Sequence, residues 1–206
     1  MRIQLPTPVH HLFSSPSFRQ ILATVASILL ASGLLSHLIG SSPIRDTAPH
    51  ATLDARAKLS ALHMAPGPDS GRDSSPANGN VPPYPGQVIP GFSGMIEVGD
   101  GTFYGLPDNG FGSKANSSDF LLRIYTVKPH WETAANAADP GAAGGVDVVD
   151  FLQVKDPDHK IPWPIVNDGT QERALTGADF DLESFVRADD GSFWIGDEFG
   201  PFILHV

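Results

Sequence analysis

Two related segments, 90 residues apart, constrain the fold of this chain more than any other feature. Residues Gly91–Gly112 read GFSGMIEVGDGTFYGLPDNGFG, and residues Asp181–Phe202 read DLESFVRADDGSFWIGDEFGPF. Each contains a short apolar run, an Asp-Gly dipeptide, an aromatic run and acidic residues beside glycine. Asp-Gly between apolar runs is the strongest short-range signal for a β-hairpin. We therefore expect a repeated hairpin whose strand ends gather carboxylates.

The spacing of the two segments indicates a repeat architecture. Propeller blades recur every 40–50 residues or so, and 90 residues fit two such periods or one blade with a long insertion. The alternative is two unrelated hairpins, because turns draw on few residue types and converge on the same chemistry. Both interpretations predict antiparallel sheets.

The C-terminal part of the chain is predicted to be all-β. It has no sustained helical period, and seven segments have strand character: 94–98, 102–106, 120–127, 146–154, 184–188, 192–196 and 202–206. Residues 88–206 are too few for three blades, whereas a closed propeller needs roughly four to eight. The apolar run 202–206 would also leave a hydrophobic strand at an open edge. We expect a β-propeller-like domain over 88–206 that forms an incomplete ring, as the N-terminal part of a longer protein.

The N-terminal part has a different composition. Residues 21–40 carry no acidic or basic residue apart from His37, and a helix of that length spans about 30 Å, the thickness of a bilayer core. Residues 1–40 are therefore predicted to be an apolar helix that is either a signal peptide or a membrane anchor. Residues 41–87 are rich in Pro, Ser and Gly and are predicted to be a disordered linker. Both alternatives for the leader place the domain outside the cytoplasm.

Composition excludes several functional classes. The chain has no cysteine, which rules out disulfides, thiolate metal sites and a cysteine nucleophile. The net charge of −10 argues against binding to nucleic acid, and contact with a membrane is expected only through the N-terminal segment. The same charge would repel a phosphorylated substrate unless a bound cation inverted the local field.

Three stretches of residues 88–206 resemble the esterase-like phytase family, also called phytase-like domain proteins. The stretch LTGADFDLESFVRADDGSFWIGDEFGPFILHV (175–206) is the most specific, GFSGMIEVGDGTFYGLPDNGFG fits the opening pattern, and KDPDHKIPWPIVND (155–168) is similar to a middle loop. The resemblance implies a β-propeller-like fold, an exported location and a phosphoesterase or esterase activity on a small phosphorylated or ester substrate. It carries over no catalytic residue, so the site is predicted from chemistry.

Alternating carboxylates make up the candidate site. Asp179, Asp181 and Glu183 would share one face of an extended strand, about 6.5–7 Å apart, where they repel one another unless a cation lies between them. Asp197 and Glu198 end one hairpin copy, Asp108 and Asn109 end the other, and these residues could add ligands. Ligands that are all oxygen favour Ca²⁺, Mg²⁺ or Mn²⁺ over zinc, and we expect Ca²⁺.

The predicted mechanism is metal-assisted hydrolysis. Asp108, Asp179, Asp181 and Asp197 are the expected metal ligands, and Glu183 and Glu198 are the expected catalytic carboxylates. Arg173 and Lys114 are the candidates for contact with a substrate phosphate. Two alternatives remain: a non-catalytic extracellular binding module and a serine-type carboxylesterase. The oligomeric state is not predicted.

Overall fold

A computed structural model describes residues 51–77, 79–136 and 144–206, and within these ranges it contains only strands, turns and loops. The all-β class is therefore confirmed. No helix in the described ranges has the length and apolarity needed to cross a bilayer. The helix predicted over residues 1–40 lies outside the described residues, as does the start of the predicted linker, 41–50.

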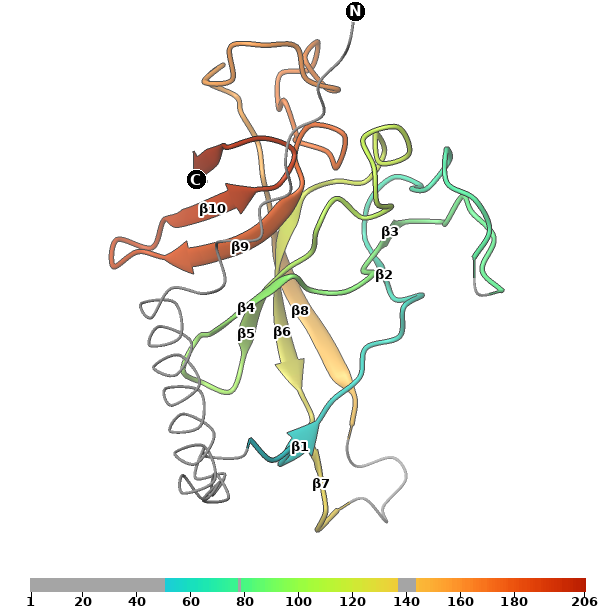
Figure 1. The fold of residues 1–206 in the computed structure, drawn as a ribbon, viewed down its shortest axis with the longest axis vertical. Coiled ribbons are helices and arrows are strands. Elements are labelled where there is room, and N and C mark those ends of the chain that lie inside the picture. Colours follow the sequence, from blue (N-terminus) through green and yellow to red (C-terminus); the bar gives the residue numbers. More distant parts are fainter. Residues whose placement is uncertain (1–50, 78, 137–143) are drawn as a thin grey trace, which may run out of the picture. The chain divides into compact units, whose positions relative to one another are not determined.

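Among the described residues, eleven strands form four antiparallel sheets. Figure 1 shows their arrangement. The two larger sheets have the orders β4-β5-β6-β8 and β11-β10-β9, and the strand pairs β1-β7 and β2-β3 stand apart from them. The strand bounds are β1 Ala55–Arg56, β2 Met64–Ala65, β3 Gln87–Val88, β4 Gly94–Glu97, β5 Phe103–Leu106, β6 Arg123–Pro129, β7 Glu132–Thr133, β8 Val146–Gln153, β9 Leu182–Arg187, β10 Phe193–Asp197 and β11 Ile203–His205. Each of the seven segments predicted to be strands overlaps one of these strands.

The two Asp-Gly segments form hairpins with the same turn. Gly101 and Gly191 have φ values of 84° and 93°, the left-handed conformation that glycine adopts without strain. In the β4–β5 turn the Asp100 carboxylate accepts bonds from the Thr102 N–H at 2.9 Å and hydroxyl at 2.5 Å. In the β9–β10 turn Asp190 accepts the equivalent bonds from Ser192 at 3.0 and 2.6 Å. The hairpin repeat predicted from the sequence is thus present in the structure.

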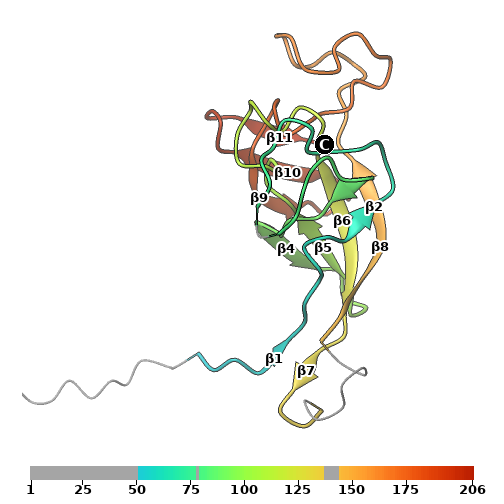
Figure 2. The same cartoon turned by 90° about the vertical axis from the view of Figure 1, so that its right-hand side faces the viewer.

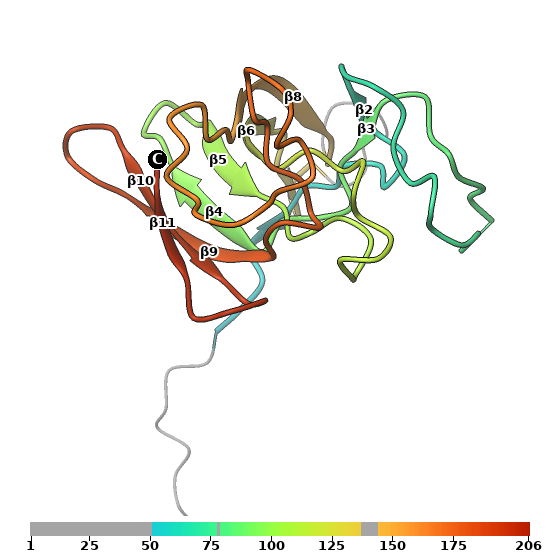
Figure 3. The same ribbon diagram turned by 90° about the horizontal axis from the view of Figure 1, so that it is seen from above.

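The two larger sheets share one hydrophobic core. Figure 3 shows β4, at the edge of the four-stranded sheet, beside β9 of the three-stranded sheet. A methyl group added at Gly94 of β4 would lie 2.9 Å from the Phe185 ring of β9, so the approach depends on glycine at this position. Tyr104 and Phe193 contact each other edge to face, with ring centroids 5.2 Å apart. This shared core fixes the position of one hairpin relative to the other.

A closed ring is not observed. Both larger sheets are open, with β8 and β11 at free edges, so the propeller-like architecture is not confirmed by the described residues (Figure 2). The β4–β9 contact joins two sheets by side-chain packing, whereas neighbouring strands within each sheet are joined by hydrogen bonds.

The structure describes the segment before the predicted domain from residue 51, apart from residue 78, and the short strands β1 and β2 lie within the stretch predicted to be a linker, 41–87. Its polar groups pair with residues of the later chain. The Gln87 side chain donates to the carbonyls of Pro68 and Asp119, both at 3.0 Å, and accepts the Leu121 N–H at 2.7 Å. The Asp119 carboxylate accepts the N–H of Gly71 at 2.9 Å and that of Arg72 at 2.8 Å. A segment that buries little apolar surface is here held by hydrogen bonds to the domain.

Candidate metal centre

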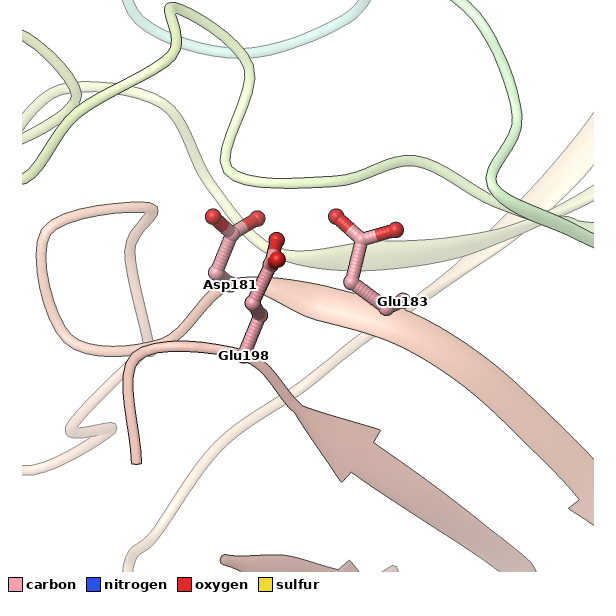
Figure 4. Close-up of side chains that lie close together, drawn as sticks. All are labelled: Asp181, Glu183 and Glu198. Carbon is pink, nitrogen blue, oxygen red and sulfur yellow. The ribbon is translucent and has the colours of Figure 1, made fainter. Parts of the chain in front are cut away.

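Three carboxylates converge where the β9–β10 hairpin opens (Figure 4). Asp181 immediately precedes β9, Glu183 lies on it, and Glu198 immediately follows β10. One carboxylate oxygen from each residue lies within 4.8 Å of the others, and all three side chains project from the same side of the hairpin. Asp181 is buried, whereas Glu183 and Glu198 are exposed. An all-oxygen set of this kind fits a hard divalent cation.

Hydrogen bonds from both hairpin segments hold Asp181 in position. Its two carboxylate oxygens accept the Asn109 backbone N–H at 3.1 Å and the Asn109 side-chain amide at 2.7 Å. Its own N–H donates to the Asp197 carboxylate at 2.7 Å, and its carbonyl accepts the Glu198 N–H at 2.8 Å. Asn109 follows the first hairpin and Asp197 ends the second, so both copies of the repeat position this one carboxylate.

A β-bulge sets the direction of the Glu183 side chain. Gly196 pairs with Ser184 and Asp197 pairs with Leu182, which leaves Glu183 without a partner across the ladder. Consequently Glu183 and Ser184 are both exposed, although neighbouring residues of a regular strand point to opposite faces. Bulges often redirect a side chain beside a functional site. The sequence predicts that alternate side chains lie on one face of the strand. Asp181 and Glu183 follow this pattern, and the residues after Glu183 do not.

The electrostatics of the cluster are unfavourable without a cation. Burial raises the pKa of Asp181, and the charges of Asp108 and Glu198 raise it further, while the bonds from Asn109 oppose the rise. Burial also raises the pKa of Glu183, followed by the charges of Asp181 and Glu198, and a hydrogen bond with Ser93 opposes it. A positive ion among these groups would offset both their burial and their mutual repulsion, and so would favour their ionised forms.

A family model described as "Phytase-like: Esterase-like activity of phytase" matches residues 87–206, which is more than half of the chain. The chain belongs to this family. The match confirms the resemblance found in the sequence, and it begins one residue before the predicted domain boundary at Val88. No curated protein and no solved structure gave a significant match.

The structure places the other carboxylates predicted in this phytase-like domain in two groups. Asp108 is near the cluster, since its charge raises the pKa of both Asp181 and Glu183. Asp179 and Asp197 are instead occupied by backbone groups. Asp179 accepts the N–H of Val166 at 2.8 Å and both the N–H and hydroxyl of Thr176, because residues 176–179 form a turn and not a strand. Asp197 accepts the N–H of Asp181 and of Gly200.

Arg173, predicted to contact phosphate, has a structural position in the phytase-like domain. It is 1 % exposed, and its guanidinium bonds the carboxylates of Asp156 and Asp168 as well as the Asp156 carbonyl. Asp156 in turn accepts the N–H groups of Lys160 at 2.7 Å and Ile161 at 3.1 Å. Arg173 therefore anchors the loop 156–170 and has no nitrogen available for a substrate. Sequence gave no signal for this, because the partners lie up to 17 residues away.

Lys114, the other predicted phosphate contact, lies over an aromatic ring next to the cluster in sequence. Its ammonium nitrogen is 4.6 Å from the centre of the Phe199 ring, the residue after Glu198. Lys114 is exposed, and none of the ion pairs among the described residues includes it. A cation–π contact of this kind leaves the ammonium donors available to a ligand.

A serine–histidine pair occurs at the second hairpin, where the His205 Nε2 lies 2.9 Å from the Ser192 hydroxyl. Ser192 is already bonded to Asp190 in the turn, and Thr102 makes the same bond in the first hairpin, where the turn works without a histidine. The hydrogen bond within the turn thus accounts for Ser192. Here the serine is bonded to both the aspartate and the histidine, whereas in a catalytic triad the histidine is bonded to both the serine and the aspartate.

Two cavities of the phytase-like domain, of about 370 and 520 Å³, lie beside β11 rather than at the carboxylates. Trp163, Phe180 and Phe202 line the smaller one. Charged side chains also line both cavities, among them Asp156, Lys155 and Lys160, but the Asp156 carboxylate is paired with Arg173. Neither cavity contains the three converging carboxylates, so we assign the candidate chemistry to the acidic cluster, which is an open surface site.

The raised pKa of Glu183 predicts a pH dependence of stability in the presence of EDTA. The Glu183 carboxyl binds its proton more tightly in the folded state than in the unfolded state, so ionisation of Glu183 destabilises the fold. This destabilisation grows as the pH rises from the pKa of Glu183 in the unfolded state to its pKa in the folded state. We expect Glu183→Gln to melt above the wild type at pH 7, with a difference that shrinks towards zero near pH 4. Thermal melts across this range check it; a difference that is constant with pH contradicts it.

Proposed function

We propose that the protein is an exported phosphoesterase that hydrolyses phosphomonoesters with the help of a divalent cation, most simply Ca²⁺. The observation that carries the proposal is the convergence of Asp181, Glu183 and Glu198 within 4.8 Å in a chain of the phytase-like family. Family membership supports an esterase or phosphatase chemistry, and the oxygen donor set supports a metal-assisted form of it.

Charge is the main reason for requiring a cation. The cluster and the neighbouring Asp108 together present four carboxylates, in a chain with net charge −10. Such a surface repels a phosphate dianion. A bound divalent cation would offset part of this charge, hold phosphate oxygens and lower the pKa of a bound water.

The residues take distinct parts in the proposed reaction. Asp181, held by Asn109, and Glu198 beside it bind the cation, and this extends the role predicted for Glu198. Glu183 completes the set, and its second oxygen is placed to accept the proton from the attacking water. Lys114, which lies over the ring of Phe199, would contribute a positive charge for the phosphate. Asp179, Asp197 and Arg173 support the backbone around these residues.

The test measures phosphate released from 4-nitrophenyl phosphate and from phytate by the full chain, with Ca²⁺, Mg²⁺ or Mn²⁺ and with EDTA. We expect release that EDTA abolishes and added cation restores. Release that survives EDTA contradicts the role of the cation. Cation binding without any phosphate release favours the non-catalytic binding module, and hydrolysis of 4-nitrophenyl acetate that survives EDTA favours a serine esterase.

Export is part of the proposal and has a separate test. It depends on the apolar segment 21–40, which the structure does not describe. Mass spectrometry of the mature N-terminus after expression in an export-competent host distinguishes a cleaved leader from a retained anchor. Recovery of the intact chain from the cytosol contradicts export.

A further inference from the structure

A buried arginine without an acidic partner lies on β6, in a part of the domain that the proposed reaction does not use. Arg123 is 4 % exposed, and its Nε donates to the Gln153 side chain at 3.0 Å on the neighbouring strand β8. Its Nη1 is buried and has no hydrogen-bond partner among the described residues. None of the ion pairs in the described ranges includes Arg123. A guanidinium cannot release its proton, so it carries its full charge into the interior.

A second unpaired donor lies two residues further along the strand. Tyr125 is 0 % exposed, and its hydroxyl also lacks a partner within the described residues. Alternate residues of a strand share a face, so both side chains extend from the same side of β6. Burial raises the pKa of Tyr125, and the charge and the side-chain N–H groups of Arg123 oppose that rise, so the two groups lie close to each other without a well-formed hydrogen bond between them. Even if the Tyr125 oxygen accepts one Nη1–H, the second Nη1–H and the Tyr125 O–H still need an acceptor.

The surroundings enclose these donors. The Phe151 ring of β8 covers the guanidinium, with its centre 3.9 Å from the Arg123 Cζ. On the segment after β2, a methyl group added at Gly67 would lie 2.9 Å from Arg123 Nη2, so the backbone approaches closely there. An aromatic face offsets part of a cationic charge but accepts no conventional hydrogen bond from Nη1. The unmet requirements are a negative charge and an acceptor for two donors.

We propose that a small monovalent anion of the halide class, chloride in most solutions, binds between the Arg123 Nη1–H and the Tyr125 hydroxyl. One spherical anion meets both requirements, because it accepts from two donors and neutralises the guanidinium. A buried water molecule would satisfy the donors but leave the charge uncompensated. The anion would neutralise a charge buried on β6 and make the stability of the domain depend on chloride.

The experiment measures the Tm of the full chain in EDTA while chloride replaces gluconate at constant ionic strength. Gluconate is too large for the site, so it serves as the reference anion. Between about 5 and 500 mM chloride we expect the Tm to rise by roughly 4 °C, as for a ligand with an affinity near ~10 mM that binds only the folded state. Arg123→Met, which keeps the length of the side chain without its charge, should remove the rise.

Arg187→Met is the matched control, because Arg187 also lies over an aromatic ring, 6.0 Å from that of Tyr104, but is exposed. This variant should retain the chloride effect. Tyr125→Phe keeps the ring and removes one donor, so it should reduce the rise in Tm with chloride. If Arg123→Met does not fold, the Tyr125→Phe variant alone tests the proposal. Equal melting of the wild type in chloride and gluconate overturns the proposal in favour of a buried water. A chloride effect that both Arg123→Met and Tyr125→Phe retain also overturns it.

Discussion

Glu198→Gln is expected to lower the rate of cation-dependent phosphate release by roughly 100-fold or more. The metal-free variant should be at least as stable as the metal-free wild type. The substitution removes one of three converging carboxylates and retains the size of the side chain. In EDTA it also removes a charge that acts on both Asp181 and Glu183. We expect the Tm in EDTA to be unchanged or to rise by about 1–3 °C.

Opposite effects on activity and stability distinguish a binding site from a structural acidic patch. Asp189→Asn is the control. Asp189 is an exposed acidic residue in the β9–β10 turn, and its substitution removes the same charge from the chain. It should change neither activity nor the response to cations. Loss of stability in Glu198→Gln together with full activity would show that the carboxylate has a structural role only.

Gly177→Ala is expected to have the largest effect on stability and to weaken cation binding at the same time. The added methyl group would lie 1.9 Å from the Asn109 carbonyl oxygen, and a backbone atom this close must move. Because Asn109 holds both carboxylate oxygens of Asp181, its displacement disturbs the site. We expect the Tm to fall by about 5–10 °C and cation affinity to fall by roughly 10-fold.

Gly169→Ala provides the comparison, because a methyl group at this exposed glycine meets no atom within 4 Å. Thermal melts in EDTA and cation titrations of both variants check the prediction. A Gly177→Ala protein that binds the cation with wild-type affinity would show that Asn109 does not position Asp181. Equal melting of the two glycine variants would contradict the close packing at Gly177.

Local patterns predicted the hairpins correctly. The Asp-Gly turns at Asp100 and Asp190 form the same bonds to the next hydroxyl residue, which is a property of three consecutive residues. The convergence of Asp181, Glu183 and Glu198 also follows from the hairpin, since residues before the first strand and after the second must lie side by side. Sequence reasoning succeeded where the determining contacts are local.

Non-local contacts account for the differences. Asp179 continues the alternating pattern of carboxylates, yet it caps a turn and accepts an N–H from Val166, 13 residues earlier. Arg173 precedes the acidic residues in sequence but is buried against Asp156 and Asp168. Within residues 51–77 and 79–87, Gln87 and Gly71 are bonded to Asp119, more than 30 residues later in the chain. Asn109 was expected, with Asp108, to add a ligand, but in the structure it holds the Asp181 carboxylate through two hydrogen bonds.

Isothermal titration of the full chain with Ca²⁺, repeated with Mg²⁺ and Mn²⁺ and supported by equilibrium dialysis, tests the central claim most directly. The account predicts saturable uptake of a divalent cation by the wild type, with an affinity in the broad range of about 10⁻⁶–10⁻³ M found for oxygen-ligand sites. It also predicts that Glu198→Gln loses this uptake and that Asp189→Asn retains it. Absence of uptake of all three cations by the folded wild type would contradict it.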